Sequence, residues 1–160
     1  MAKTNEFEIY VKLPVNATAS NTLLDLTDYV DIADNEALKV DAVDIVVDPT
    51  GTLADAGADA TFIFQLADSN IQAFVSHSDR TSLYTAQMMY GSGDNQLSHT
   101  ESFSDLTPLI VNKTLTCRHD VAPATISGTF NFTLRIRGKI VKPSAKDYMA
   151  LVLTQTGNVA

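Results

Sequence analysis

Residues 128–142 read GTFNFTLRIRGKIVK and form the longest unbroken alternation of side-chain character in the chain. One side of this segment carries the apolar residues Phe130, Phe132, Leu134, Ile136 and Ile140. The other side carries the polar residues Asn131, Thr133, Arg135, Arg137 and Lys139. Because successive side chains of a β-strand point to opposite faces, this period of two predicts a long strand with one buried face.

Gly138 interrupts the apolar side of this predicted strand. A glycine inside a strand marks a bulge, a bend or the close approach of another backbone. A straight strand over the whole segment would span roughly 50 Å, far more than the usual strand, so we expect a bend near Gly138. Pro143 has no N–H to donate to a ladder, and we expect it to end the strand.

Alternating or apolar segments elsewhere bring the number of predicted strands to about eight. Besides 128–142, the predicted strands are 7–13, 22–26, 38–47, 61–66, 71–76, 82–90 and 108–117. Only residues 67–70 separate 61–66 from 71–76, and we expect this pair to form a hairpin. Residues 97–107 are predicted to be a long polar connection.

Turn-forming residues separate these segments, and no strand–helix–strand alternation is visible, which disfavours a parallel sheet. We therefore predict a single all-β domain over residues 1–160, built as an antiparallel two-sheet β-sandwich. The strand count fits a jelly-roll type with about eight strands or an immunoglobulin-like arrangement. The cysteine and tryptophan hallmarks of immunoglobulin domains are absent.

The C-terminal segment leaves two structures open. Ser144 and Asp147 have the spacing of a helix capping box, and apolar residues follow from Tyr148 onward. A short C-terminal helix and a last strand both fit this pattern. We expect residues 151–160 to pack on the core of their own chain rather than on a neighbour.

Composition sets limits on the cellular setting. No apolar run reaches the roughly eighteen residues of a membrane-spanning helix, so we expect no such helix. Residues 1–10 lack the apolar region of a signal peptide, so we expect no signal peptide. Cys117 is the only cysteine, which excludes an intramolecular disulfide. It alternates in register with Leu115, which favours a small core residue over a reactive thiol.

Charge is distributed unevenly along the chain. The formal net charge of −8 argues against a nucleic-acid-binding domain, since such binding neutralises phosphates with Lys and Arg. Residues 1–60 hold twelve acids and three bases, whereas residues 61–160 hold seven acids and eight bases. The bases Arg135, Arg137 and Lys139 form either an ordinary solvated sheet face or a surface that meets acids of another copy. The acidic candidates for that contact are Asp25, Asp28 and Asp31.

The sequence contains no catalytic signature. The histidines are His77, His99 and His119, and no nucleophile motif or phosphate-binding glycine motif accompanies them. His119 would share a strand face with Cys117, but two side chains are too few ligands for zinc. We therefore expect neither an enzyme nor a cofactor.

A cluster of aspartates raises one metal hypothesis. Asp28, Asp31 and Asp34 recur at three-residue intervals, and clustered carboxylates are ligands for calcium. The aspartate–glycine pattern of a calcium-binding loop is missing, and acid-rich loops are commonly just solvated. Calcium binding at these residues is a hypothesis beside that simpler interpretation.

Three stretches carry a resemblance to a known family. They are YVDIADNEAL at 29–38, FNFTLRIRGK at 130–139 and KDYMALVL at 146–153. In pattern and size, the chain resembles the compact single jelly-roll capsid proteins of small tailless icosahedral viruses. This resemblance implies a structural coat protein that self-assembles into an icosahedral shell. It would be made in the host cytoplasm and located in the virion.

The resemblance also implies partners. The first would be other copies of the chain, and further capsid proteins or an internal membrane could complete the shell. Many such proteins carry a basic N-terminal arm for the genome, but Lys3 and Lys12 here lie amid Glu6 and Glu8. We therefore expect no strong nucleic-acid-binding arm, and genome contact would come from elsewhere.

The alternative is a non-catalytic ligand-binding β-sandwich, such as a carbohydrate-binding module or an appendage or fibre subunit. Carbohydrate platforms use exposed aromatic side chains. The chain has no tryptophan, and its five tyrosines are scattered, which disfavours this alternative.

Overall fold

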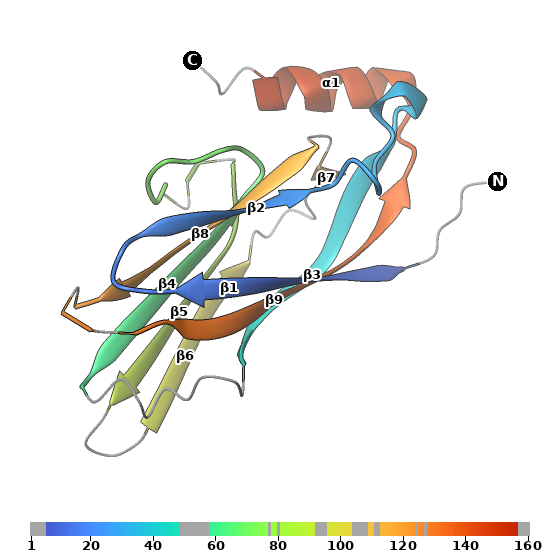
Figure 1. Ribbon diagram of the computed structural model, residues 1–160. Coiled ribbons are helices and arrows are strands. Elements are labelled where there is room, and N and C mark those ends of the chain that lie inside the picture. Colours follow the sequence, from blue (N-terminus) through green and yellow to red (C-terminus); the bar gives the residue numbers. More distant parts are fainter. Residues whose placement is uncertain are drawn as a thin grey trace.

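The computed structural model describes residues 6–48, 58–76, 78–79, 81–91, 96–103, 109–110, 113–123, 125–126 and 128–156. In these residues the chain forms nine strands, one short 3-10 helix and one α-helix (Figure 1). The strands are β1 (Phe7–Val15), β2 (Ser20–Asp25), β3 (Ala37–Val47), β4 (Ala60–Ala67), β5 (Ser82–Gly91), β6 (Gln96–Phe103), β7 (Leu109–Ile110), β8 (Thr114–Ala122) and β9 (Phe130–Val141). The helices are η1 (Ile32–Asp34) and α1 (Ala145–Thr156).

The strands form two antiparallel sheets that face each other. The first sheet has the order β1-β9-β3-β7, and the second has the order β2-β8-β4-β5-β6. The pairs β1·β9, β2·β8, β3·β7 and β4·β5 are nested in sequence, as in one long hairpin rolled into two sheets. This pairing is that of a jelly roll, with β6 added to the edge of the second sheet. The predicted antiparallel two-sheet sandwich of jelly-roll type is confirmed.

The strand predicted from the alternation at 128–142 is β9, which lies between β1 and β3. Its apolar side is buried from Phe130 to Ile136, with Leu134 and Ile136 fully shielded from solvent, and Ile140 is partly buried. Phe132 meets two aromatic rings of β4 across the sandwich, with centroid distances of 5.0 Å to Phe62 and 4.8 Å to Phe64. The alternation therefore predicted the strand and its buried face correctly, because these aromatic residues fill the space between the sheets.

Gly138 lies at an irregularity, but the bulge belongs to the neighbouring strand. The register between β3 and β9 shifts between Val40 and Ala42, where β3 holds one extra residue. β9 itself pairs without interruption with β1 from Phe7 opposite Gly138 to Val15 opposite Phe130. At Gly138 the structure shows a bulge in β3 and a close approach of its backbone. The expected bend of the strand near Gly138 stays a prediction.

The predicted hairpin between 61–66 and 71–76 is wrong. β4 pairs instead with β5, and residues 68–76 run between them without forming a strand. We call residues 68–76 the strap. Its backbone is bonded by side chains of the second sheet: the Gln65 amide exchanges two 2.8 Å hydrogen bonds with the N–H and C=O of Val75, and Asn21 Nδ2 donates to Ile71 O at 2.7 Å. These side-chain partners replace the ladder that a hairpin would supply.

Two more segments differ from the prediction. The polar connection predicted at 97–107 is largely the strand β6, and residues 104–107 lie outside the described residues. The single strand predicted at 108–117 is two strands, β7 in the first sheet and β8 in the second. β8 continues to Ala122, beyond the predicted end at residue 117, so His119 lies inside the strand.

The C-terminal segment is a helix, which decides between the two alternatives left by the sequence. Ser144 Oγ accepts a hydrogen bond from Asp147 N at 3.2 Å and donates to Asp147 Oδ2 at 2.6 Å, so the helix begins with the predicted cap. Tyr148 is buried against Ala37, and Leu151 packs on the same small cluster. α1 lies at one end of the sandwich, at the top of Figure 1. Residues 157–160 of the predicted packing segment lie outside the described residues.

No helix in the described part of the chain is both long and apolar enough to cross a membrane.

Candidate functional site

The outer face of the first sheet carries a ladder of charged side chains. The register aligns Glu8 of β1 with Arg137 of β9, and it aligns Tyr10 of β1 with Arg135 of β9. On the other side of β9, Asp44 of β3 lies opposite Arg135. Alternation points all these side chains away from the core, so one sheet face gathers residues from three strands.

Arg135 and Asp44 form a two-pronged ion pair across β9 and β3. Arg135 Nε donates to Asp44 Oδ1 at 2.7 Å, and Arg135 Nη2 donates to Asp44 Oδ2. Both side chains are more than 40% exposed, at 46% for Arg135 and 41% for Asp44. These hydrogen bonds hold the pKa of Asp44 below its ordinary value and raise the pKa of Arg135. The pair is therefore ionised at neutral pH but screened by solvent.

Glu8 is shared by two donors on the same face. The Tyr10 hydroxyl donates to Glu8 Oε2, and Arg137 Nε donates to Glu8 Oε1 at 3.2 Å. The hydrogen bond from Tyr10, followed by that from Arg137, holds the pKa of Glu8 below its ordinary value. The same bond raises the pKa of Tyr10, so that hydroxyl keeps its proton.

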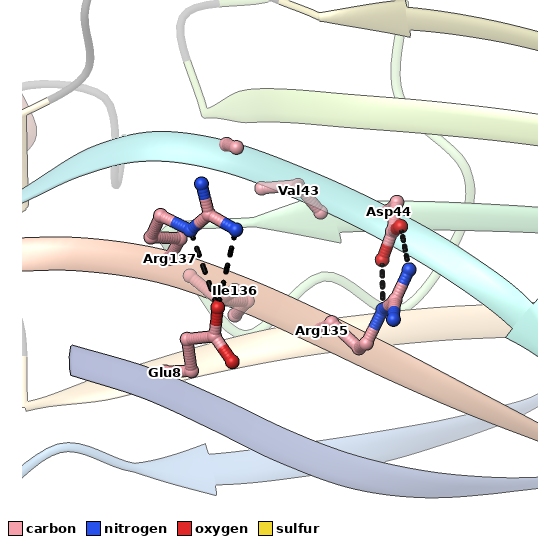
Figure 2. A pocket seen from close by; sticks show the side chains of 7 residues that line it. Glu8, Val43, Asp44, Arg135, Ile136 and Arg137 are labelled. Atoms are coloured by element: carbon pink, nitrogen blue, oxygen red, sulfur yellow. Dashed lines mark hydrogen bonds and ion pairs between the residues drawn. The ribbon is translucent and has the colours of Figure 1, made fainter.

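A small hollow lies between the two ion pairs, as Figure 2 shows, with Arg137 turned toward Glu8 and Arg135 turned toward Asp44. Its volume is about 150 Å³, and Ala42, Val43 and Ile136 complete its lining. Ala42 lies opposite Arg137 in the register, and its short side chain leaves the space open. The carboxylates around this hollow have lowered pKa values, whereas a general acid or base needs a pKa near the working pH.

The basic residues predicted to meet another copy are mostly occupied within their own chain. Arg135 and Arg137 pair with Asp44 and Glu8. Lys139 lies directly opposite Lys39 of β3 and makes no ion pair with any residue that the structure describes. We call Arg135, Arg137 and Lys139 the basic stripe. Within the described residues, Lys139 is the member of this stripe whose charge is not paired with a carboxylate.

The predicted acidic residues lie away from this stripe. Asp25 ends β2 and accepts hydrogen bonds from the backbone N–H of Thr27 at 2.8 Å and from its hydroxyl. Asp31 Oδ1 accepts from Ala33 N at 2.9 Å at the start of η1. No contact between Asp25, Asp28 or Asp31 and the stripe is formed in the described chain, so a role for them in contacts between copies stays a prediction.

Asp34 is the acid that does meet a base close to the end of β9. Lys142 Nζ lies 3.2 Å from Asp34 Oδ2 and 3.5 Å from Glu36 Oε1. The contact joins the acidic segment to the basic segment inside one chain. In the folded chain, two acids of the acidic segment 1–60 are therefore paired with a base of the segment 61–160.

The calcium hypothesis for Asp28, Asp31 and Asp34 gains no geometric support. Within the described residues, no three acidic, histidine or cysteine side chains are grouped to hold a metal ion. Asp28 and Asp31 line a depression of about 480 Å³ together with the base Lys113, while Asp34 is turned to Lys142. Calcium binding at these residues stays a prediction.

The nucleophile and imidazole groups inside the sandwich are enclosed. Cys117 is fully buried, and burial raises the pKa of its thiol to about 12. This confirms the prediction of a core cysteine. His119 is 1% exposed, its Nε2 lies 3.2 Å from Thr22 Oγ1, and burial lowers its pKa. His99 lies on the exposed strand β6, and His77 falls outside the described residues.

Sequence reasoning missed Glu8 and Asp44 as the partners of the arginine stripe. Both residues stood on the polar side of predicted strands, which was the available signal. The missing information was strand order, since Glu8 and Arg137 are 129 residues apart and Asp44 and Arg135 are 91 apart.

No protein-family model and no curated protein matches this sequence. Among solved structures, the chain is similar to one titled Desmodium yellow mottle tymovirus. The similarity covers 89% of this chain and 92% of that chain, with 11% identical residues and a TM-score of 0.41. At these values the similarity carries no argument about function.

Proposed function

We propose that this chain is a structural, non-enzymatic capsid protein that self-assembles into an icosahedral shell, with residues 1–160 forming one domain. The carrying observation is a jelly roll of four nested strand pairs closed over a solid core. Jelly rolls of this kind include viral capsid domains. The resemblance of residues 29–38, 130–139 and 146–153 to single jelly-roll capsid proteins supports the same role. The protein would then be located in the virion.

The packing of the core supports a role for the outer surfaces. Phe62, Phe64 and Phe132 fill the space between the sheets, and all three are fully buried. A sandwich filled in this way offers two stiff faces and its sheet edges to other molecules, rather than a ligand chamber. Identical copies can close a shell by repeating such contacts.

Of the three bases predicted to contact another copy, only Lys139 is without a carboxylate partner among the described residues. Arg135 and Arg137 are engaged by carboxylates of their own sheet, whereas Lys139 is not. An acidic segment of another copy, such as the one holding Asp25, Asp28 and Asp31, would supply the opposite charge. Other capsid proteins or an internal membrane stay open as further partners.

The size of the purified protein in solution tests this function. Light scattering and negative-stain microscopy across salt and pH should reveal closed particles or rings of five or six copies. Lys139→Glu should reduce assembly, and Lys12→Glu is the matched control on the same sheet face. A strict monomer at high concentration in every condition would contradict the proposal.

The ligand-binding alternative has one observation in its favour. Tyr10 is 61% exposed and flanks the hollow through its bond to Glu8, which gives an aromatic ring next to polar groups. A monomer that binds an immobilised glycan, and loses that binding on Tyr10→Ala, would favour this function over the shell.

A further inference from the structure

The strand β6 forms one edge of the second sheet. It pairs only with β5, and no other strand in the described chain pairs with its second edge. Its described side chains, from Leu97 to Glu101, are all exposed, with Leu97 at 47%. Proteins usually guard such edges with charged side chains, especially lysine, or with proline, a bulge or a very short strand, and of these β6 has one acid, Glu101. β6 spans Gln96–Phe103 without lysine or proline, and its register with β5 shows no shift.

The sequence of β6 is complementary to itself when read in opposite directions. Residues 97–103 read LSHTESF, with Thr100 at the centre. Equal steps outward from Thr100 reach His99 and Glu101, then Ser98 and Ser102, then Leu97 and Phe103. The three pairs are an imidazole with a carboxylate, two hydroxyls, and two apolar residues.

We propose that β6 pairs antiparallel with β6 of a second copy around a two-fold axis through Thr100, which joins two five-stranded sheets into one. In this register His99 lies opposite Glu101 of the second copy, and Leu97 lies opposite Phe103 of the second copy. Each such pair occurs twice because the contact is isologous. Directly opposite side chains of these types stabilise antiparallel strands.

Neighbouring symmetric registers are poorer. Centring the pair on His99 would place Leu97 opposite Glu101 of the second copy. Centring it on Glu101 would place two carboxylates opposite each other, and like charges in that position destabilise a sheet. Thr100 is therefore the centre that the side chains of β6 favour.

Glu101 is held on the strand by a hydrogen bond and keeps an exposed side chain. Glu101 Oε2 accepts a 2.8 Å hydrogen bond from the Tyr84 hydroxyl, and burial raises the pKa of Tyr84 so that it stays a donor. The Glu101 side chain is nevertheless 53% exposed, and its Oε2 lies 3.9 Å from His99 Nε2 of its own strand. It is thus held in place on the strand and still open to an imidazole from outside.

The proposed pairing deepens the proposed function, because it names one contact between copies and rests on the shell for its biological setting. The contact itself does not require a shell. Shells whose Thr100 residues do not meet would overturn the pairing and leave the function standing. Dimers that pair through β6 but never close into particles would support the pairing and contradict the proposed function.

Disulfide trapping tests the pairing. Thr100→Cys would place two cysteines about 4.5–5.5 Å apart between Cα atoms, within the range of a disulfide. Ser98→Cys is the matched control, because its two copies would be more than about 13 Å apart along the strands. Cys117 is buried and contributes no background. We expect a covalent dimer on mild oxidation for Thr100→Cys and none for Ser98→Cys.

Charge substitution gives a second readout, the dissociation constant of the dimer measured by analytical ultracentrifugation. His99→Glu places like charges opposite each other twice, and we expect the dimer to weaken by roughly ten-fold. Adding Glu101→Lys should restore most of the affinity, since opposite charges then face each other again. Equal crosslinking of the two cysteine variants, a wild-type chain that stays monomeric at millimolar concentration, or a double variant that is no tighter than His99→Glu would overturn the proposal.

Discussion

The backbone at Gly138 lies so close to the carbonyl oxygen of Lys39 that a β-carbon on residue 138 would be only 2.5 Å from that oxygen. The same β-carbon would be 2.9 Å from Leu38 Cδ1. The oxygen belongs to the backbone of β3 at its bulge, so it has little freedom to move. The close approach explains why the apolar side of β9 is interrupted by glycine.

We expect Gly138→Ala to destabilise the protein. The added methyl group has to displace β3 or β9, and such overpacking costs about 1–3 kcal/mol of unfolding free energy. Urea denaturation followed by circular dichroism measures the change. Gly91→Ala is the matched control, since a β-carbon there meets no atom within 4 Å. Equal stabilities for the two variants would contradict the close approach.

The strap should detach when Gln65 is truncated. Gln65 is 2% exposed, and its amide bonds both backbone groups of Val75 as well as Ser82 Oγ at 3.0 Å. Gln65→Ala leaves these groups without partners and should cost about 1–3 kcal/mol. Limited digestion with chymotrypsin, read at Phe74 in the strap, should become faster. Gln72→Ala is the control, because among the described residues Gln72 bonds only its exposed neighbour Asn70.

The alternation of side chains was enough to predict the strands with one buried and one exposed face. In the predicted strand 82–90, which is β5, the alternate residues Tyr84, Ala86, Met88 and Tyr90 form one face, and all four are buried. β6 was not predicted as a strand. It is an edge strand whose described side chains are exposed, so its sequence shows no alternation of apolar and polar residues. The strap was misread as a strand because its partners are side chains such as Asn21, fifty residues away. The charged ladder likewise depended on strand order, which the sequence does not carry.

The exposed pair of Arg135 and Asp44 should contribute little to stability. Solvent screens both groups, so Asp44→Asn should cost no more than about 1 kcal/mol at neutral pH. The folded-state pKa of Asp44 is lowered, so the contribution is present above the ordinary value of 3.8 and is lost as pH falls through the lowered pKa. Thermal melts of wild type and Asp44→Asn should therefore differ slightly at pH 7 and converge in strong acid. A constant difference at all pH values would contradict this assignment.

Asp68 should impose the opposite pH dependence. It lies at the start of the strap, it is 6% exposed, and burial, followed by the nearby charge of Asp79, raises its pKa to about 6. Between the ordinary value of 3.8 and about 6, the folded state holds the proton more tightly than the unfolded state. Stability from this group is therefore fully present below the ordinary pKa and is lost as pH rises through the raised one.

The size of that loss is bounded by the pKa shift, which corresponds to at most about 3 kcal/mol. Asp68→Asn removes the titrating proton and keeps the shape of the side chain. We expect the variant to have a flatter profile of unfolding free energy between pH 4 and pH 7, and to be more stable than wild type at pH 7. Asp79→Asn is the comparison, because Asp79 has a lowered pKa set by bonds from the backbone and hydroxyl of Thr81. If Asp68→Asn left the slope unchanged, the carboxylate would have to be solvated in the folded state, and the strap would be more open than its contacts with Gln65 and Asn21 imply.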